Sequence, residues 1–244
     1  MTPTETAARL KKPIGDLGMQ FMADPLTREA GKQLGLRSRP LYHLGRGGAL
    51  GEVSVEVVIA AFAFFPPQVV TEHWNAAREV MDGPECARAY AGMCNDWGRR
   101  AFTGQPGIGR ADELLGTVIA AAQSAGLPLF AGWRQVVLPA DVPGRLAQRL
   151  HVMREHRGAV HVAAVAAVGL DPLAAVVAGT YGVANATFFE WPEPYPDPDL
   201  HREAWAAAET LTAAAASSPY DVLTDAECDE LVALLEGLHA TVLG

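Results

Sequence analysis

The sequence predicts an all-α protein, a bundle of many helices built around one large core. Apolar residues recur with helical spacing over most of the chain, and no sustained alternation of apolar and polar residues indicates a strand. Helix start signals are frequent, as at Asp24-Pro25 and at Thr224-Asp225-Ala226-Glu227, which is typical of a capping box. With 244 residues, 50% hydrophobic and 19% charged, the chain is long and apolar enough to bury a sizeable core.

Four segments are predicted along the chain. Residues 1–23 are polar and weakly patterned, which favours a flexible N-terminal arm. Residues 24–182 are predicted to form the helical core domain, with a pocket. Prolines at four alternate positions predict an extended linker over residues 183–198, and residues 199–244 predict C-terminal helices that pack on the core or on a partner. The helices expected in the core domain cover 24–36, 39–44, 54–65, 68–81, 84–102, 110–125, a long stretch after residue 143, and 173–180.

Charge and cysteine usage limit the class of protein. The formal net charge is −9, which argues against a broad nucleic-acid surface, since such a surface needs clustered lysine and arginine. Cys86, Cys94 and Cys228 show no C-x-x-C spacing, which fits reduced thiols better than a disulfide framework. No signal peptide is evident and the longest apolar runs are too short to span a bilayer, so a cytoplasmic protein without membrane contact is expected.

The stretch from Met153 to His161 concentrates arginine and histidine directly before an apolar run. At 100° per residue, Arg154, Arg157, Gly158 and His161 fall on one face of a helix, within about a third of a turn. Apolar residues share that face, so it is expected to point inward. Inward cations are costly unless an anionic or hydrogen-bonding group meets them. That group can be a ligand or a carboxylate of the same protein, and the sequence alone leaves both open.

Each member of this cluster suggests a role. Arg154 and Arg157 suit a carboxylate, phosphate or sulfate, because a guanidinium offers a planar fork of donors. Internal ion pairs that merely fasten helices are the alternative. His161 lies in apolar surroundings that should lower its pKa and keep it neutral, as a general base requires. His156 is the weaker candidate base, since it is expected to point away from the arginines.

Other residues are candidates for the same pocket. Arg46 lies between glycines and is expected to reach the pocket from a flexible loop. Tyr42, Phe65 and Trp74 are candidate walls of a substrate cavity, with ordinary core packing as the alternative. No metal site is expected, because His156 and His161 face different sides of a helix and no further ligand pair completes a set. The glycine-rich stretch at Arg46 lacks the ending of a phosphate-binding loop, and no cofactor is predicted.

Two parts of the chain resemble a family of actinobacterial proteins classed as helix-turn-helix proteins for a winged-helix-like C-terminal part. The first runs from Leu36-Arg37-Ser38-Arg39 to His73-Trp74, and the second is Arg154-Glu155-His156-Arg157-Gly158 followed by His161. The resemblance covers about Pro25 to Ala178. It implies that a winged part should follow, where this chain has the proline-rich segment instead. The winged-helix-like part is therefore expected to be degenerate, which favours a specialised biosynthetic paralogue over a DNA-reading regulator.

Taken together, these features predict a small-molecule enzyme of specialised metabolism that acts on an anionic substrate without a cofactor. The residues suit an elimination or an intramolecular displacement, such as ring closure to an aziridine with loss of sulfate or phosphate. The alternative is a ligand-binding transcriptional regulator, or a self-resistance protein that sequesters an anionic metabolite. A second copy of the chain or a small partner protein is expected to cover the surface that the missing winged part leaves.

Overall fold

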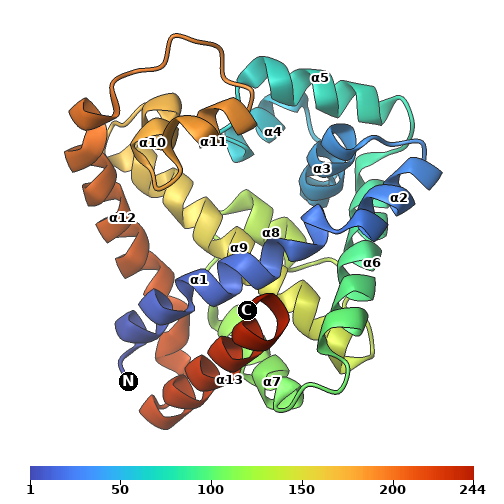
Figure 1. Cartoon of the computed structure of the whole chain (residues 1–244), viewed down its shortest axis with the longest axis vertical. Helices are drawn as coiled ribbons and strands as arrows, with labels where there is room; N and C mark the ends of the chain where they lie inside the picture. Colours follow the sequence, from blue (N-terminus) through green and yellow to red (C-terminus); the bar gives the residue numbers. More distant parts are fainter.

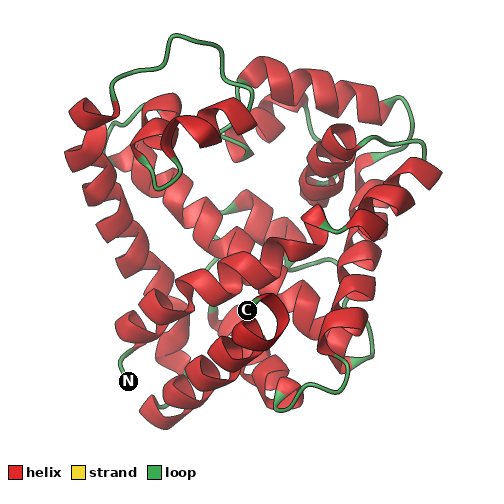
Figure 2. Cartoon of the chain, viewed as in Figure 1, coloured by secondary structure: helices red, strands yellow, loops and turns green.

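The computed structural model describes residues 1–244 as α-helices and short 3-10 turns, without a strand (Figure 2). The all-α prediction is confirmed. The α-helices are α1 (Pro3–Ala23), α2 (Pro25–Gln33), α3 (Ser38–Gly47), α4 (Val55–Ala61), α5 (Pro67–Arg78), α6 (Gly83–Phe102), α7 (Ile108–Ala121), α8 (Pro128–Trp133), α9 (Val142–Ala167), α10 (Pro172–Ala178), α11 (Gly182–Phe188), α12 (Arg202–Ser217) and α13 (Asp225–Leu243). The 3-10 turns are η1 (Gly48–Leu50), η2 (Pro198–His201) and η3 (Ser218–Val222).

Helix α9 is the central element of the fold, and α1, α6, α7, α8 and α12 all pack against it (Figure 1). Asp141 caps its start by accepting a hydrogen bond from the Gly144 amide at 2.9 Å. Buried residues lie all around the helix, as expected of a helix enclosed by others. The sequence predicted one inward face for this helix, and the buried surface is wider than that face.

The expectation of a flexible arm over residues 1–23 is wrong, because these residues form α1. Thr2 and Glu5 close a capping box at its start. Leu10, Leu17 and Phe21 are fully buried, and α1 crosses α9 with α13 on its other side (Figure 1). The large apolar residues Leu10, Ile14, Leu17 and Phe21 share one face of this helix and find apolar partners far along the chain.

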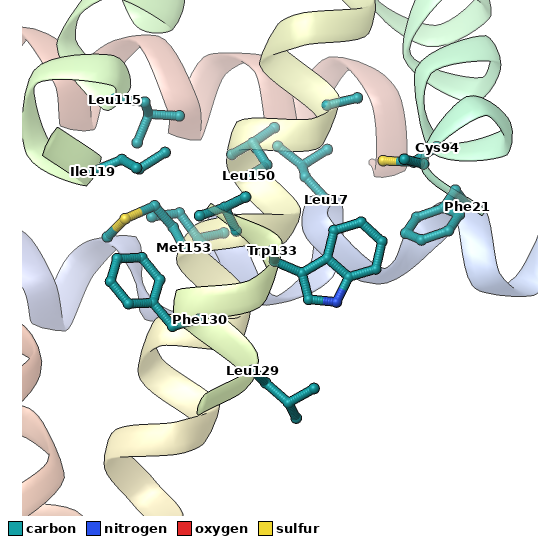
Figure 3. Close-up of a cluster of buried hydrophobic side chains, with 14 of the residues drawn as sticks. Leu17, Phe21, Cys94, Leu115, Ile119, Leu129, Phe130, Trp133, Leu150 and Met153 are labelled. Carbon is teal, nitrogen blue, oxygen red and sulfur yellow. The ribbon is translucent and has the colours of Figure 1, made fainter. Parts of the chain in front are cut away.

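The core fills the space between α1, α8 and α9. Phe130 and Trp133 of α8, a helix that the sequence did not predict, lie against Leu150 and Met153 of α9 (Figure 3). Leu17 and Phe21 of α1 approach the same cluster, together with residues of α6 and α7 (Figure 3). This packing fixes α9 between α1 and α8, and it therefore positions the side chains that α9 carries.

The proline-rich segment is only partly the predicted linker. Helix α11 occupies its first residues, and an extended stretch then runs from α11 to α12 along the edge of the molecule (Figure 1). Trp191 anchors this stretch by donating from Nε1 to the Phe64 carbonyl at 2.9 Å. Helix α12 packs on α9, and α13 packs on α1. A wing is a strand hairpin, so the strandless C-terminal part of this chain contains no wing.

No single helix is long and apolar enough to cross a membrane. Helices α9 and α10 reach the required length and hydropathy only together, across a bend of 111°.

Candidate functional site

A buried ion pair joins α3 to α9. Arg46 donates from Nε and Nη2 to the two carboxylate oxygens of Glu155, at 2.9 and 2.8 Å. The Glu155 side chain is fully buried, and only 11% of the Arg46 side chain is exposed. Arg154 adds a third hydrogen bond to Glu155 at 2.9 Å. The alternative that Arg154 and Arg157 pair with carboxylates of the same protein is thus realised with one bond each, since Arg157 donates to Glu209 at 3.0 Å.

The surroundings of this ion pair determine the protonation states of Glu155 and of the nearby His151. Burial alone would raise the pKa of Glu155, but the charge and hydrogen bonds of Arg46 outweigh burial and lower the pKa to about 2. One turn earlier, His151 is fully buried between the rings of Phe21 and Trp133. Burial lowers the pKa of His151 to about 4. At neutral pH the carboxylate is therefore charged and the imidazole neutral.

Arg46 reaches this pair from a helix and not from the flexible loop that was expected. Helix α3 continues through Gly47, and close packing leaves no room for side chains at Gly45 or at its C-cap, Gly48. A Cβ at Gly45 would lie 2.6 Å from the Tyr90 ring, and one at Gly48 would lie 1.9 Å from the Gly83 carbonyl oxygen. The Arg46 guanidinium lies 4.4 Å over the Phe62 ring and donates to the Tyr42 hydroxyl at 3.3 Å.

A cavity of about 610 Å³ lies beside this ion pair, which is in the size range of small-molecule sites. Helix α1 forms one wall and α9 another, and residues of α3, of the α4–α5 connection and around α11 and η3 complete it. Sixteen of its 26 lining residues are hydrophobic, so an apolar part of a ligand would find apolar walls. Six of the residues that the sequence singled out line it: Tyr42, Arg46, Phe65, Arg154, His156 and Arg157.

Cations that sequence reasoning did not assign to the site come from α1. Lys11 and Lys12 line the cavity. Lys11 and Arg157 both donate to Oε2 of Glu209 on α12, at 2.6 and 3.0 Å, while Lys12 pairs with Asp16. The sequence shows the two adjacent lysines, but a flexible arm over residues 1–23 would not hold them at a site. The folding of these residues into α1 brings both to the cavity.

His156 lies in the cavity wall, although it was the weaker candidate and was expected to point away from the arginines. Only 3% of His156 is exposed, and its ring meets the Phe130 ring edge-on, with 4.9 Å between the ring centroids. Burial alone lowers its pKa to about 4, with no charged or hydrogen-bonding neighbour contributing. The cavity extends around a wide sector of α9, which is why residues of different helical faces line it. His156 is therefore a neutral imidazole without a protein partner.

Two predicted residues lie elsewhere. His161 does not line the cavity; its Nδ1 lies 2.9 Å from the Thr212 hydroxyl and 3.4 Å from the Glu209 carboxylate on α12. Burial lowers its pKa, in the expected direction. Trp74 is 3% exposed in the core, where its ring leaves no room for a side chain at Gly47. His161 therefore fastens α9 to α12, and Trp74 packs α5 against α3.

No three His, Cys, Asp or Glu side chains lie together in an arrangement that could hold a metal ion. The polar groups of the cavity are instead mostly guanidinium and ammonium groups, with three phenols, one imidazole, the Thr180 hydroxyl and the single carboxylate of Asp16. Such groups favour an anion or a hydrogen-bond acceptor.

The helix-turn-helix family matches residues 7–208 of the chain. This range begins in α1 and ends in α12, so it extends on both sides beyond the segment from Pro25 to Ala178 on which the resemblance rests. It includes every residue that lines the cavity except Ala216 and Tyr220. No curated protein and no solved structure matches the sequence. Because the match covers most of its length, the chain belongs to a helix-turn-helix family.

Proposed function

We propose that this protein binds a small anionic molecule in the cavity between α1 and α9 and acts on it as an enzyme without a cofactor. The observation that carries the proposal is the incomplete hydrogen bonding of Arg154 and Arg157, which line the cavity one helical turn apart. Their side chains are 25% and 28% exposed, and each makes a single hydrogen bond to a carboxylate. Most of their guanidinium donors are therefore free to bind an anion.

The charge balance of the cavity supports an anionic ligand. Its wall carries five cationic side chains: Lys11, Lys12, Arg46, Arg154 and Arg157. Three carboxylates contact them, namely Asp16, Glu155 and Glu209, so two positive charges remain in excess. The apolar lining strengthens the attraction between these charges and a ligand, because it lowers the local dielectric constant. The cavity thus attracts anions although the whole chain carries a net charge of −9.

His156 supplies a group that can move a proton. It is neutral at physiological pH and follows Arg154 and precedes Arg157 on α9. In an elimination or an intramolecular displacement, the imidazole takes a proton from a C–H or N–H group of the substrate. The electron pair of the C–H bond forms a C=C bond, or the nitrogen lone pair forms a C–N bond, while the bond from carbon to the sulfate or phosphate oxygen breaks. The departing anion carries the electron pair of that broken bond to the arginines. Ring closure to an aziridine is one reaction of this class, and specialised metabolism is its setting in this proposal.

Anion binding is the first test. Calorimetric titration with sodium sulfate and sodium phosphate should show binding to wild type that Arg154→Gln and Arg157→Gln weaken at least ten-fold each. Arg99→Gln is the matched control, because Arg99 is an exposed arginine paired with Asp96 and Asp141 outside the cavity. Equal affinity in wild type and in both cavity variants contradicts the proposal.

The reaction class is tested by release of sulfate. With 2-aminoethyl sulfate as the probe, we expect wild type to release inorganic sulfate and form aziridine faster than the buffer does, as measured by ion chromatography. His156→Gln should remove this acceleration while sulfate binding persists. Unchanged acceleration in His156→Gln excludes His156 as the base.

A ligand-binding regulator is the second candidate, and membership of a helix-turn-helix family favours it. Two helix pairs could form a helix-turn-helix, α2–α3 and α4–α5, and both weigh against direct DNA reading. In the first pair, α3 follows the turn at Gly35 and is largely buried. In the second pair, α5 exposes the negatively charged Glu72 to solvent. A gel-shift titration with duplex DNA decides between the candidates, because a regulator requires binding that weakens steeply with salt.

A further inference from the structure

We propose that the ligand of this cavity carries an aromatic ring next to its anionic group. This inference rests on the proposed function, since it takes the same cavity and the same arginines. It concerns the aromatic end of the cavity, around Tyr42 and Phe65, and it names the chemical class of the group that binds there.

The evidence is a contiguous set of aromatic side chains in the cavity wall. Tyr42 of α3, Phe64 and Phe65 of the α4–α5 connection, and Phe189 after α11 all line the cavity. Phe65 joins Tyr42 and Phe189, with its ring centroid 5.7 Å from that of Tyr42 and 4.5 Å from that of Phe189, while the Phe64 ring lies against His161. Tyr42, Phe64 and Phe189 are only half-buried, so their rings are not saturated by core contacts. Aromatic rings prefer tilted or edge-on contact with further rings at such distances.

Arg46 connects this aromatic end to the anion site. Its guanidinium shares Oε1 of Glu155 with Arg154, while the same guanidinium lies on the Phe62 ring and against the Tyr42 hydroxyl. Arg154 is therefore linked to the aromatic wall through Glu155 and Arg46. An anion held by Arg154 would place the group bonded to it beside Tyr42 and Phe65.

The expected gain follows from the ring contacts. Aromatic pairs contribute affinity beyond the area they bury, which corresponds to roughly two- to twelve-fold in a dissociation constant. A saturated ring of the same size buries similar area without a π face, so the difference between phenyl and cyclohexyl ligands isolates this contribution. Inorganic sulfate reports the anion site alone.

The experiment is calorimetric titration of the full chain with phenyl sulfate, cyclohexyl sulfate and inorganic sulfate. Wild type should bind phenyl sulfate at least ten-fold more tightly than inorganic sulfate, and two- to twelve-fold more tightly than cyclohexyl sulfate. Phe189→Leu should abolish the preference for phenyl over cyclohexyl and leave the affinity for inorganic sulfate unchanged. Phe188→Leu is the matched control, because Phe188 is the adjacent phenylalanine, is 61% exposed and does not line the cavity.

Equal affinity for phenyl and cyclohexyl sulfate in wild type overturns the inference, as does a preference that persists in Phe189→Leu. If Phe189→Leu is misfolded by circular dichroism, Phe64→Leu takes its place. The arginine variants separate this failure from that of the proposed function. When Arg154→Gln abolishes binding but the two ring ligands bind alike, only the aromatic inference fails. When Arg154→Gln and Arg157→Gln bind phenyl sulfate as wild type does, the anion site fails as well.

Discussion

Replacing Glu155 by glutamine should destabilise the protein strongly, because it removes the charge that neutralises a buried arginine. Glu155 is fully buried and accepts two hydrogen bonds from Arg46 and one from Arg154. An amide offers one acceptor oxygen and no charge, so the Arg46 guanidinium, 11% exposed, keeps its charge without a counter-ion. Breaking a buried pair by removing one partner costs about 3–5 kcal/mol of unfolding free energy.

Urea unfolding at pH 7, followed by circular dichroism, measures this loss as a lower midpoint at unchanged slope. In a thermal melt the same loss corresponds to roughly 6–20 °C for a chain of this size. Glu230→Gln is the control, since it removes one of several carboxylates around the exposed Arg110 and should leave the midpoint close to that of wild type.

A double variant tests the cause. Arg46→Met combined with Glu155→Leu removes both charges and keeps the volume apolar, so it should recover most of the stability that Glu155→Gln loses. A loss below about 1 kcal/mol in Glu155→Gln would refute the reasoning, since buried pairs cost more than that to break. A double variant that is less stable than Glu155→Gln would refute it as well, because the uncompensated charge would then not be the cause.

Two further predictions concern pH and packing. Stability should fall as the pH decreases from about 6.5 toward 4, because the unfolded chain then binds protons at His43, His151 and His156, whose folded pKa values burial lowers to about 3, 4 and 4. Each contributes up to about 1.4 kcal/mol per pH unit in that window, so urea midpoints at pH 7, 6 and 5 should decrease, and a flat series contradicts the prediction. Gly18→Ala should lower stability by about 1–3 kcal/mol, since the added Cβ would lie 2.7 Å from the Leu150 carbonyl oxygen of α9. Gly15→Ala meets nothing within 4 Å in the same helix and should raise stability by about 0.5–1 kcal/mol, so equal melting temperatures for the two variants would show that α1 does not pack as described.

Sequence patterns predicted the fold class and part of the cavity wall. Helical spacing and capping residues are local properties, and they indicated an all-α chain because helices satisfy their backbone hydrogen bonds within themselves. The clustering of Arg154 and Arg157 on α9 followed from their spacing of three residues. Tyr42, Arg46 and Phe65 were also named from the sequence, and α3 and the α4–α5 connection bring them to the same cavity.

Only the tertiary structure decided which histidine enters the cavity and whether the N-terminal segment folds. A helical spacing gives angles about the axis, but it does not tell which neighbour occupies each sector. Since five helices surround α9, His161 meets α12 while His156 meets the cavity. Likewise, the apolar face of α1 is buried only because α9 and α13, far away in sequence, supply the surface that covers it. Local sequence determined most of the helices, though not α1, α8 or α11, and long-range packing determines which helical faces become a site.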